Sequence, residues 1–150
     1  MKLYYVAGPF SAKTREGVEE NIRAADFVGR QLARICLYPV VPHNNTAHPQ
    51  YERLQPYPFW IAGTLELLKC CDALVVVPGW EESSGARGEV AWALGETGPT
   101  VVRWFYRLKR RLTGTGRRPV YLHPYNALMR DPAFRRRVPT CLTTAREAGK

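Results

Sequence analysis

Two short segments of the chain carry residue types that could bind and cleave a polar ligand. The first, Gly8-Pro9-Phe10-Ser11, follows an apolar run near the start of the chain. The second, residues 78–89, combines three glycines with the hydroxyl groups of Ser83 and Ser84 and the carboxyl group of Glu89. A helix that begins near Ser83 would offer free backbone N–H groups and a dipole that favour an anion. Glu89 could face the same cavity; alternatively, Ser83 is only a helix cap and Glu89 is solvated.

Four further side chains could contact a ligand, although a purely structural role is also possible for each. His43 and His48 lie in a proline-punctuated segment, residues 43–58, that we interpret as a long functional loop. A histidine titrates near neutral pH and can act as a general acid, but a structural or solvated role fits these two equally well. Trp80 could stack on a nucleobase or pack in the core or an interface. Arg87 could pair with a phosphate or lie on a solvated helix face.

Alternating strands and helices are expected to position these residues. Short apolar, β-rich runs predict strands at residues 3–7, 37–41, 73–77 and 100–102, and a fifth at 120–122. Apolar residues at three- and four-residue steps predict helices at residues 14–35, 60–70 and 83–94, the first capped by Thr14. This order predicts a doubly wound, parallel α/β sheet of four to five strands, Rossmann-like or flavodoxin-like. Ligands bind such sheets at the carboxyl ends of the strands, where both candidate segments lie.

Charge is divided unevenly along the 150 residues. The whole chain carries +9, but residues 1–100 hold 9 basic and 11 acidic side chains, whereas residues 101–150 hold 13 and 2. We therefore expect one α/β domain over residues 1–103 and a basic extension over residues 104–150, packed on that domain or trailing it. Arginines and aromatic residues between 103 and 137 could contact nucleic acid or steer anionic ligands. The alternative is a solvated surface or a subunit contact.

The sequence argues against several other classes of protein. No apolar run approaches the roughly 20 residues that span a bilayer, so we expect no membrane insertion, and residues 1–13 lack the pattern of a signal peptide. The four cysteines have no CxxC spacing, so we expect neither a disulfide framework nor a zinc site and favour a reducing cytoplasm. No GxGxxG follows the first apolar run and no GxxxxGK[ST] occurs, which argues against dinucleotide and P-loop sites. We expect no metal and no cofactor.

Three sequence blocks occur in an order that carries a family resemblance. The blocks are Tyr5-Val6-Ala7-Gly8-Pro9-Phe10, then Cys71-Asp72-Ala73-Leu74-Val75-Val76-Val77-Pro78-Gly79-Trp80, then Ser83-x-Gly85-x-x-x-Glu89-x-Ala91. Together they resemble the nucleoside 2-deoxyribosyltransferase-like superfamily, which includes the 2′-deoxynucleoside 5′-phosphate N-hydrolases and related small phage and bacterial proteins. The likeness covers residues 1–103.

The resemblance implies roles for the matching residues. Glu89 stands at the position of the nucleophile that attacks the sugar C1′ to form a glycosyl-enzyme, which water or a second base then resolves. At the position of Ser83 the transferases carry an aspartate that holds sugar hydroxyls, whereas the nucleotide hydrolases carry a serine that accepts a 5′-phosphate. Tyr5 matches a tyrosine of the first strand, and residues 8–11 match a sugar–phosphate loop. Members of the superfamily are commonly dimers or larger, so the resemblance also implies a homo-oligomer.

One position departs from the family pattern. The family usually carries an aspartate eight residues before the strand-opening Asp72, where it positions the sugar and manages the proton of the leaving base. This chain has Thr64 there, and Glu66, two residues on, is expected to face away. Asp72 itself is expected to be structural. Protonation of the leaving base would then come from elsewhere, for example from the segment of His43 and His48.

We therefore predict cleavage of the N-glycosidic bond in a nucleoside 5′-monophosphate, by hydrolysis or by deoxyribosyl transfer. The predicted substrate site comprises Tyr5, Gly8, Pro9, Phe10, Ser11, His43, Trp80, Ser83, Ser84, Gly85 and Glu89. Two alternatives come from other classes: a non-catalytic nucleotide-binding module, which Thr64 would allow, and a nucleic-acid-binding protein that acts through the basic extension. The identity of the base and the choice between ribose and deoxyribose depend on the shape of the pocket.

Overall fold

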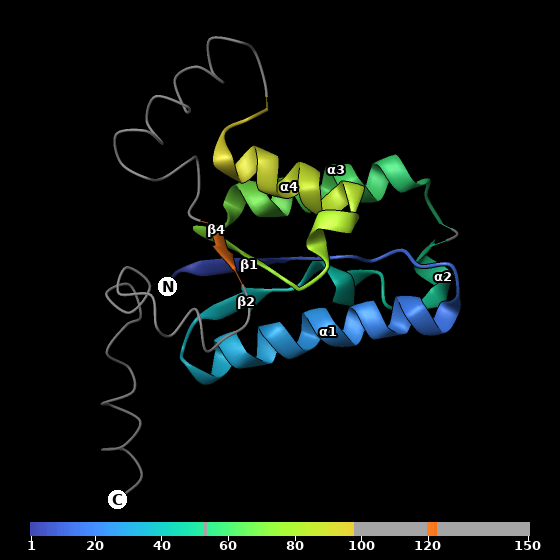
Figure 1. Cartoon of the computed structure of the whole chain (residues 1–150), viewed down its shortest axis with the longest axis horizontal. Coiled ribbons are helices and arrows are strands. Elements are labelled where there is room, and N and C mark those ends of the chain that lie inside the picture. Colours follow the sequence, from blue (N-terminus) through green and yellow to red (C-terminus); the bar gives the residue numbers. More distant parts are fainter. Residues whose placement is uncertain (53, 98–119, 123–150) are drawn as a thin grey trace, which may run out of the picture.

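Parallel strands form the central layer of the molecule (Figure 1). The computed structural model describes residues 1–52, 54–97 and 120–122. Strand β1 (Leu3–Ala7) lies between β2 (Tyr38–Val40) and β3 (Ala73–Val76), and β4 (Val120–Leu122) pairs with the other side of β3. All three pairings are parallel, with Tyr5 opposite Val40 on one side and opposite Leu74 on the other.

Helices cover both faces of the sheet, as Figure 1 shows. Helix α1 (Arg15–Arg34) lies against one face, whereas α3 (Tyr57–Cys70) and α4 (Ser84–Leu94) lie against the other. The prediction of a mixed α/β fold with a parallel sheet is confirmed, and the arrangement is consistent with a Rossmann-like fold. The predicted strands at 3–7, 37–41, 73–77 and 120–122 are present, with β2 and β3 shorter than predicted. The predicted strand at 100–102 and the basic extension beyond 103, apart from β4, lie outside the described residues.

Alternation of side chains along β1 divides the core into two clusters. Tyr4 and Val6 point toward α1 and pack with its buried residues, among them Val28 and Leu32. Tyr5 and Ala7 point to the opposite face and pack in the cluster that holds Leu68, Val90 and Ala93. Strands β1 and β3 are buried almost throughout, as strands covered by helices on both faces must be. The same alternation places the Tyr5 hydroxyl on the side of α4.

Two helices begin where the sequence predicted. The Thr14 side chain accepts a hydrogen bond from the backbone N–H of Gly17, and the Ser83 side chain accepts one from that of Ala86. Gly95 ends α4 in a left-handed conformation with φ of 78°, which glycine adopts without strain.

The prediction that residues 43–58 form a long functional loop was wrong about secondary structure, although His43, Thr46 and Tyr57 of this segment line the cavity described below. This segment contains most of the 3-10 helix η1 (Pro42–Asn45), the short α2 (Pro49–Glu52) and the first two residues of α3, which begins at Tyr57 rather than Trp60. Prolines punctuate all three helices, but Pro42 and Pro58 occupy first-turn positions, where a missing N–H costs nothing. Proline content therefore concealed the beginnings of helices.

The described cysteines differ in their surroundings. Cys36 has a left-handed backbone conformation with φ of 59°, whereas Cys70 is an exposed free thiol and Cys71 a buried one. Within the described residues, no helix is long and apolar enough to cross a membrane.

Candidate active site

A cavity of about 790 Å³ lies at the carboxyl ends of the strands. Its walls come from the segments that follow β1, β2 and β3 and from the first turns of α3 and α4. This is the edge at which parallel α/β sheets bind ligands. Ten predicted site residues line it: Tyr5, Gly8, Pro9, Phe10, Ser11, His43, Ser83, Ser84, Gly85 and Glu89.

Glu89 and Tyr5 form the central pair of the cavity. The Tyr5 hydroxyl donates a hydrogen bond to Glu89 Oε1 at 2.5 Å, which joins strand β1 to helix α4 across 84 residues of sequence. Glu89 lies three residues after Ala86 and four before Ala93, both buried, so it belongs to the sheet-facing stripe of α4. Glu89 is therefore not a solvated helix residue, which was the alternative.

The surroundings change the acidity of both partners. Partial burial of Glu89 raises the pKa of its carboxyl group to about 7, even though hydrogen bonds from Tyr5 and Thr64 act in the opposite direction. Burial, together with the nearby Glu89 carboxylate, raises the pKa of the Tyr5 hydroxyl above its usual range. Tyr5 is therefore a permanent donor at neutral pH, whereas Glu89 exchanges between acid and carboxylate there.

The loop of residues 8–11 is held in place from two sides. His43 lies against its backbone, with Nε2 3.0 Å from the carbonyl oxygen of Pro9. Asn21, on α1, donates from Nδ2 to the carbonyl of Phe10 at 3.1 Å. Gly8 passes so close to Val77 that an added Cβ would lie 2.8 Å from the Val77 Cβ. The loop thus presents a fixed backbone to the cavity.

His43 is a neutral, buried side chain in this arrangement. A carbonyl oxygen can only accept, so Nε2 carries the ring proton and donates it to Pro9. Burial lowers the pKa of His43 below its usual value, which keeps the ring uncharged at neutral pH. Nδ1 is also buried and has no hydrogen-bond partner among the described residues. This geometry favours a role in holding the loop over the predicted alternative of a general acid.

The first turn of α4 forms the polar end of the cavity. Ser83 caps the helix, and the next residues, Ser84 and Gly85, line the cavity beside it. Helix N-terminal N–H groups and hydroxyls can bind an anion there. In the part of the lining that the structure describes, the charged side chains are those of Glu82 and Glu89, with no lysine or arginine. An anion at this end would be held by hydrogen bonds and the helix dipole rather than by cations.

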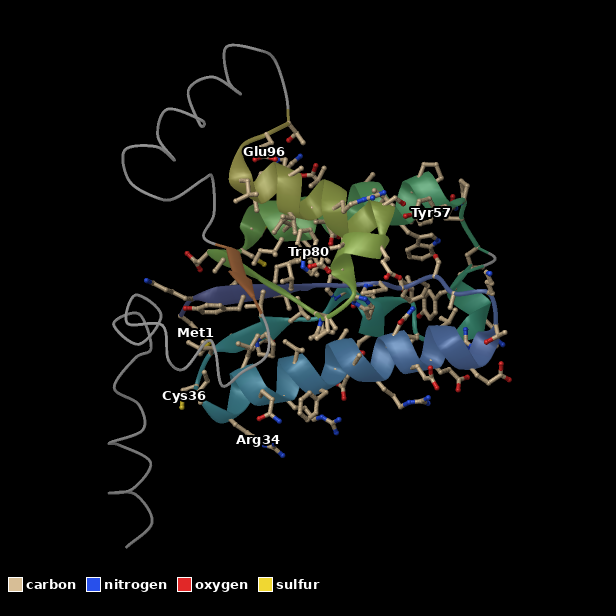
Figure 2. The ribbon with its side chains drawn as sticks, in the orientation of Figure 1. Met1, Arg34, Cys36, Tyr57, Trp80 and Glu96 are labelled. Carbon is tan, nitrogen blue, oxygen red and sulfur yellow. The ribbon has the colours of Figure 1, made fainter. Side chains whose placement is uncertain are left out.

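Three side chains lie apart from the predicted ligand positions. Trp80 does not line the cavity; it packs against the core cluster that contains Leu74 and Val90. Figure 2 shows it beneath α4, between that helix and the sheet. Its place on the short 3-10 helix η2 (Trp80–Glu82) directs it to the core, so the structural alternative is correct. Arg87 and His48 are exposed and also lie outside the lining.

Other residues of the lining were missed by the sequence analysis. Tyr57, Trp60 and Ile61 belong to the first turns of α3, and Asn21 belongs to α1. An aromatic pair three residues apart at a helix start was visible in the sequence, but nothing there indicated that this start lies over the sheet edge. Only the packing of α3 on the sheet brings these side chains to the cavity.

Thr64, the residue that departs from the pattern of the resembled superfamily, lines the cavity. The Thr64 hydroxyl donates its single proton to the Ile61 carbonyl at 3.1 Å. Its proximity to the central pair lowers the pKa of both Tyr5 and Glu89. Glu66 is exposed and pairs with Lys69, as its predicted orientation away from the site requires. Asp72 accepts from the backbone N–H of Leu3 at 2.8 Å, so its expected structural role is confirmed.

The arrangement combines a part-buried carboxyl group, a fixed backbone loop and a helix N-terminus around one cavity. Among the described residues, no group of three or more histidine, cysteine or acidic side chains is placed to hold a metal ion. A comparison with curated proteins finds no match. The family model named "Domain of unknown function (DUF4406)" matches residues 1–102, which contain every described residue of the cavity lining, and the chain therefore belongs to the DUF4406 family.

Proposed function

We propose that the cavity cleaves the N-glycosidic bond of a nucleoside 5′-monophosphate, with Glu89 as the nucleophile. The observation that carries this proposal is the hydrogen-bonded pair of Tyr5 and Glu89 at the carboxyl ends of the strands. A partly buried carboxylate with a single strong donor is suited to attack an electrophilic sugar carbon. The resemblance to the nucleoside 2-deoxyribosyltransferase-like superfamily supplies the substrate class.

The reaction has two steps that balance. Glu89 Oε attacks C1′ as the bond between C1′ and the base nitrogen breaks, and the bonding electrons leave with the base, which takes a proton from water. Water, or a second base in a transferase, then attacks C1′, gives up one proton to the solvent and releases the Glu89 carboxylate, so that one proton is taken up and one returned in each cycle. Thr64 cannot supply an acidic proton to the leaving base, but Glu82, exposed on η2, is the other carboxyl group of the described lining.

The polar end of the cavity suits the 5′-phosphate. Ser83, Ser84 and the free N–H groups of α4 offer donors, and the helix dipole favours a negative charge. Residues 8–11 present their fixed backbone beside the sugar. The predicted strand at 100–102, a homo-oligomer and a cytoplasmic location remain predictions from the sequence.

The test is release of free base from a panel of ribo- and 2′-deoxyribonucleoside 5′-monophosphates and the matching nucleosides. We expect Glu89→Gln to reduce release at least about a thousandfold. Glu81→Gln is the matched control, because Glu81 is exposed and lies outside the cavity lining. Release that survives Glu89→Gln would contradict the proposal.

A second outcome would favour the alternative of a binding module. Thr64 in place of an acidic residue is the observation that supports it. Nucleotides that bind to the protein but release no base, with or without an acceptor base, would establish that function instead.

A further inference from the structure

The first turn of α3 forms a wall of the cavity that the proposed reaction does not use. Tyr57 and Trp60 both line the cavity, and their spacing of three residues places them on the same side of the helix. Figure 2 shows Tyr57 at the end of the upper helical layer, away from Trp80. The wall is therefore aromatic, and it belongs to a different element from the nucleophile.

Trp60 is held rigidly by its neighbours. Its indole Nε1–H donates to the carbonyl oxygen of Gln55 at 3.1 Å. The ring makes edge-type contacts with Phe59, with centroids 5.1 Å apart, and with Tyr51, at 6.4 Å. The indole N–H is thus committed within the protein, and the ring is oriented before a ligand arrives. A preorganised ring loses little entropy when a ligand binds against it.

The aromatic wall adjoins the polar end of the cavity. A Cβ added at Gly85, on the first turn of α4, would lie 3.2 Å from the Tyr57 hydroxyl. One cavity thus contains a flat apolar surface, a carboxylate on α4 and a helix N-terminus. A ligand that used all three would need a planar ring, a reactive centre and an anionic group in one molecule.

We propose that Trp60, supported by Phe59 and Tyr51, is the stacking surface for the base of the substrate. This inference rests on the proposed function, because it assigns the base end of the same site. Trp60 offers the ligand a π surface and no hydrogen-bond donor, so it selects a planar heteroaromatic ring without distinguishing one base from another. Discrimination among bases would have to come from other groups.

The test compares nucleotides, which carry a base, with the sugar phosphate, which lacks one. Calorimetric dissociation constants are measured for 2′-deoxynucleoside 5′-monophosphates with each of the four bases and for 2-deoxyribose 5-phosphate. We expect Trp60→Leu, which keeps an apolar side chain but removes the aromatic ring, to weaken nucleotide binding about tenfold to a hundredfold. Binding of the sugar phosphate should change less than about twofold, and Trp60→Phe should restore most of the nucleotide affinity.

Trp80→Leu is the matched control, since Trp80 is the same residue type, is partly buried and lies outside the cavity lining. It should leave the ratio of the two affinities unchanged. Equal weakening of both ligands by Trp60→Leu would show a merely structural role and overturn the inference, as would unchanged nucleotide binding. Failure of the wild-type protein to bind either ligand would overturn both proposals. If Trp60→Leu selectively loses nucleotide affinity but the wild-type protein releases no base, the stacking role of Trp60 would stand and the proposed catalysis would be wrong.

Discussion

Glu89 and His43 both line one cavity, and burial disfavours the charged form of each side chain. Burial raises the pKa of Glu89 to about 7 and lowers that of His43, because each environment disfavours the ionised form. Their partners differ. Glu89 meets a side chain, the hydroxyl of Tyr5, whereas His43 meets the backbone carbonyl of Pro9. Glu89 can therefore change its protonation state near neutral pH, whereas His43 stays neutral and holds the backbone of the loop.

The largest expected effect concerns stability and pH on the Glu89 side. In the unfolded chain Glu89 ionises near the ordinary glutamate pKa of 4.5, whereas the folded protein retains the proton until about pH 7. The folded state is therefore destabilised as pH rises through this window, by at most about 3 kcal/mol. Glu89→Gln removes this cost, so the variant should gain stability relative to wild type between pH 4.5 and 8 in urea unfolding.

Glu81→Gln serves as the control here too, because Glu81 is exposed and lies outside the cavity lining. A Glu89→Gln variant whose stability relative to wild type does not change over this range would show that the carboxyl group is not held in its neutral form.

The next effect sharpens the role of the partner side chain. Wild-type kcat/KM for base release should rise with pH through about 7, as Glu89 becomes a carboxylate. Tyr5→Phe removes a hydrogen bond that lowers the pKa of Glu89, so the rise should move to higher pH. Activity at pH 7 should fall roughly tenfold to a hundredfold, as expected for loss of a hydrogen bond to a charged group.

Tyr4→Phe is a stringent comparison for that experiment. Tyr4 is the adjacent tyrosine of β1, equally buried, but it packs in the cluster on the α1 side of the sheet. Its variant should keep the wild-type pH profile. If Tyr5→Phe and wild type had identical pH profiles, Tyr5 would have no influence on the pKa of Glu89.

The smallest effect tests the His43 side. Since His43 is neutral when folded and charges more readily when unfolded, its contribution to stability is present above pH 6.5 and is lost as pH falls below that value. His43→Leu should remove this acid sensitivity, with the opposite sign to Glu89→Gln. It should also lower the free energy of unfolding at pH 8 by about 1 kcal/mol, because the Pro9 carbonyl loses its donor.

Urea unfolding at pH 8 and pH 5 would measure both changes, with His48→Leu as the exposed control. Equal acid sensitivity in His43→Leu and wild type would mean that another group is responsible for it.

The polar side of the cavity, formed by residues 8–11, Ser83 and Glu89, was largely predictable because these residues lie on or directly after regular elements. Apolar periodicity located β1, β3 and α4, and Ser83 caps its helix as its residue type indicates. The carboxyl ends of parallel strands share one edge, so the segments after β1 and β3 had to meet there. The aromatic half was not predictable, because prolines concealed the start of α3 and the sequence offered Trp80 as the stacking candidate.

The amino-acid sequence by itself determined the parallel α/β fold, the two candidate segments and the place of Glu89 on a helix after the third strand. These follow from short-range patterns, which act through hydrogen bonds and apolar faces within one element. Only the tertiary structure decided that Trp60 rather than Trp80 lines the cavity. It also decided that His43 donates a hydrogen bond to the Pro9 carbonyl and that Tyr5 donates one to Glu89. Those contacts depend on how side chains from separate elements pack together in one buried volume, and the pattern of residues within a single element does not predict that packing.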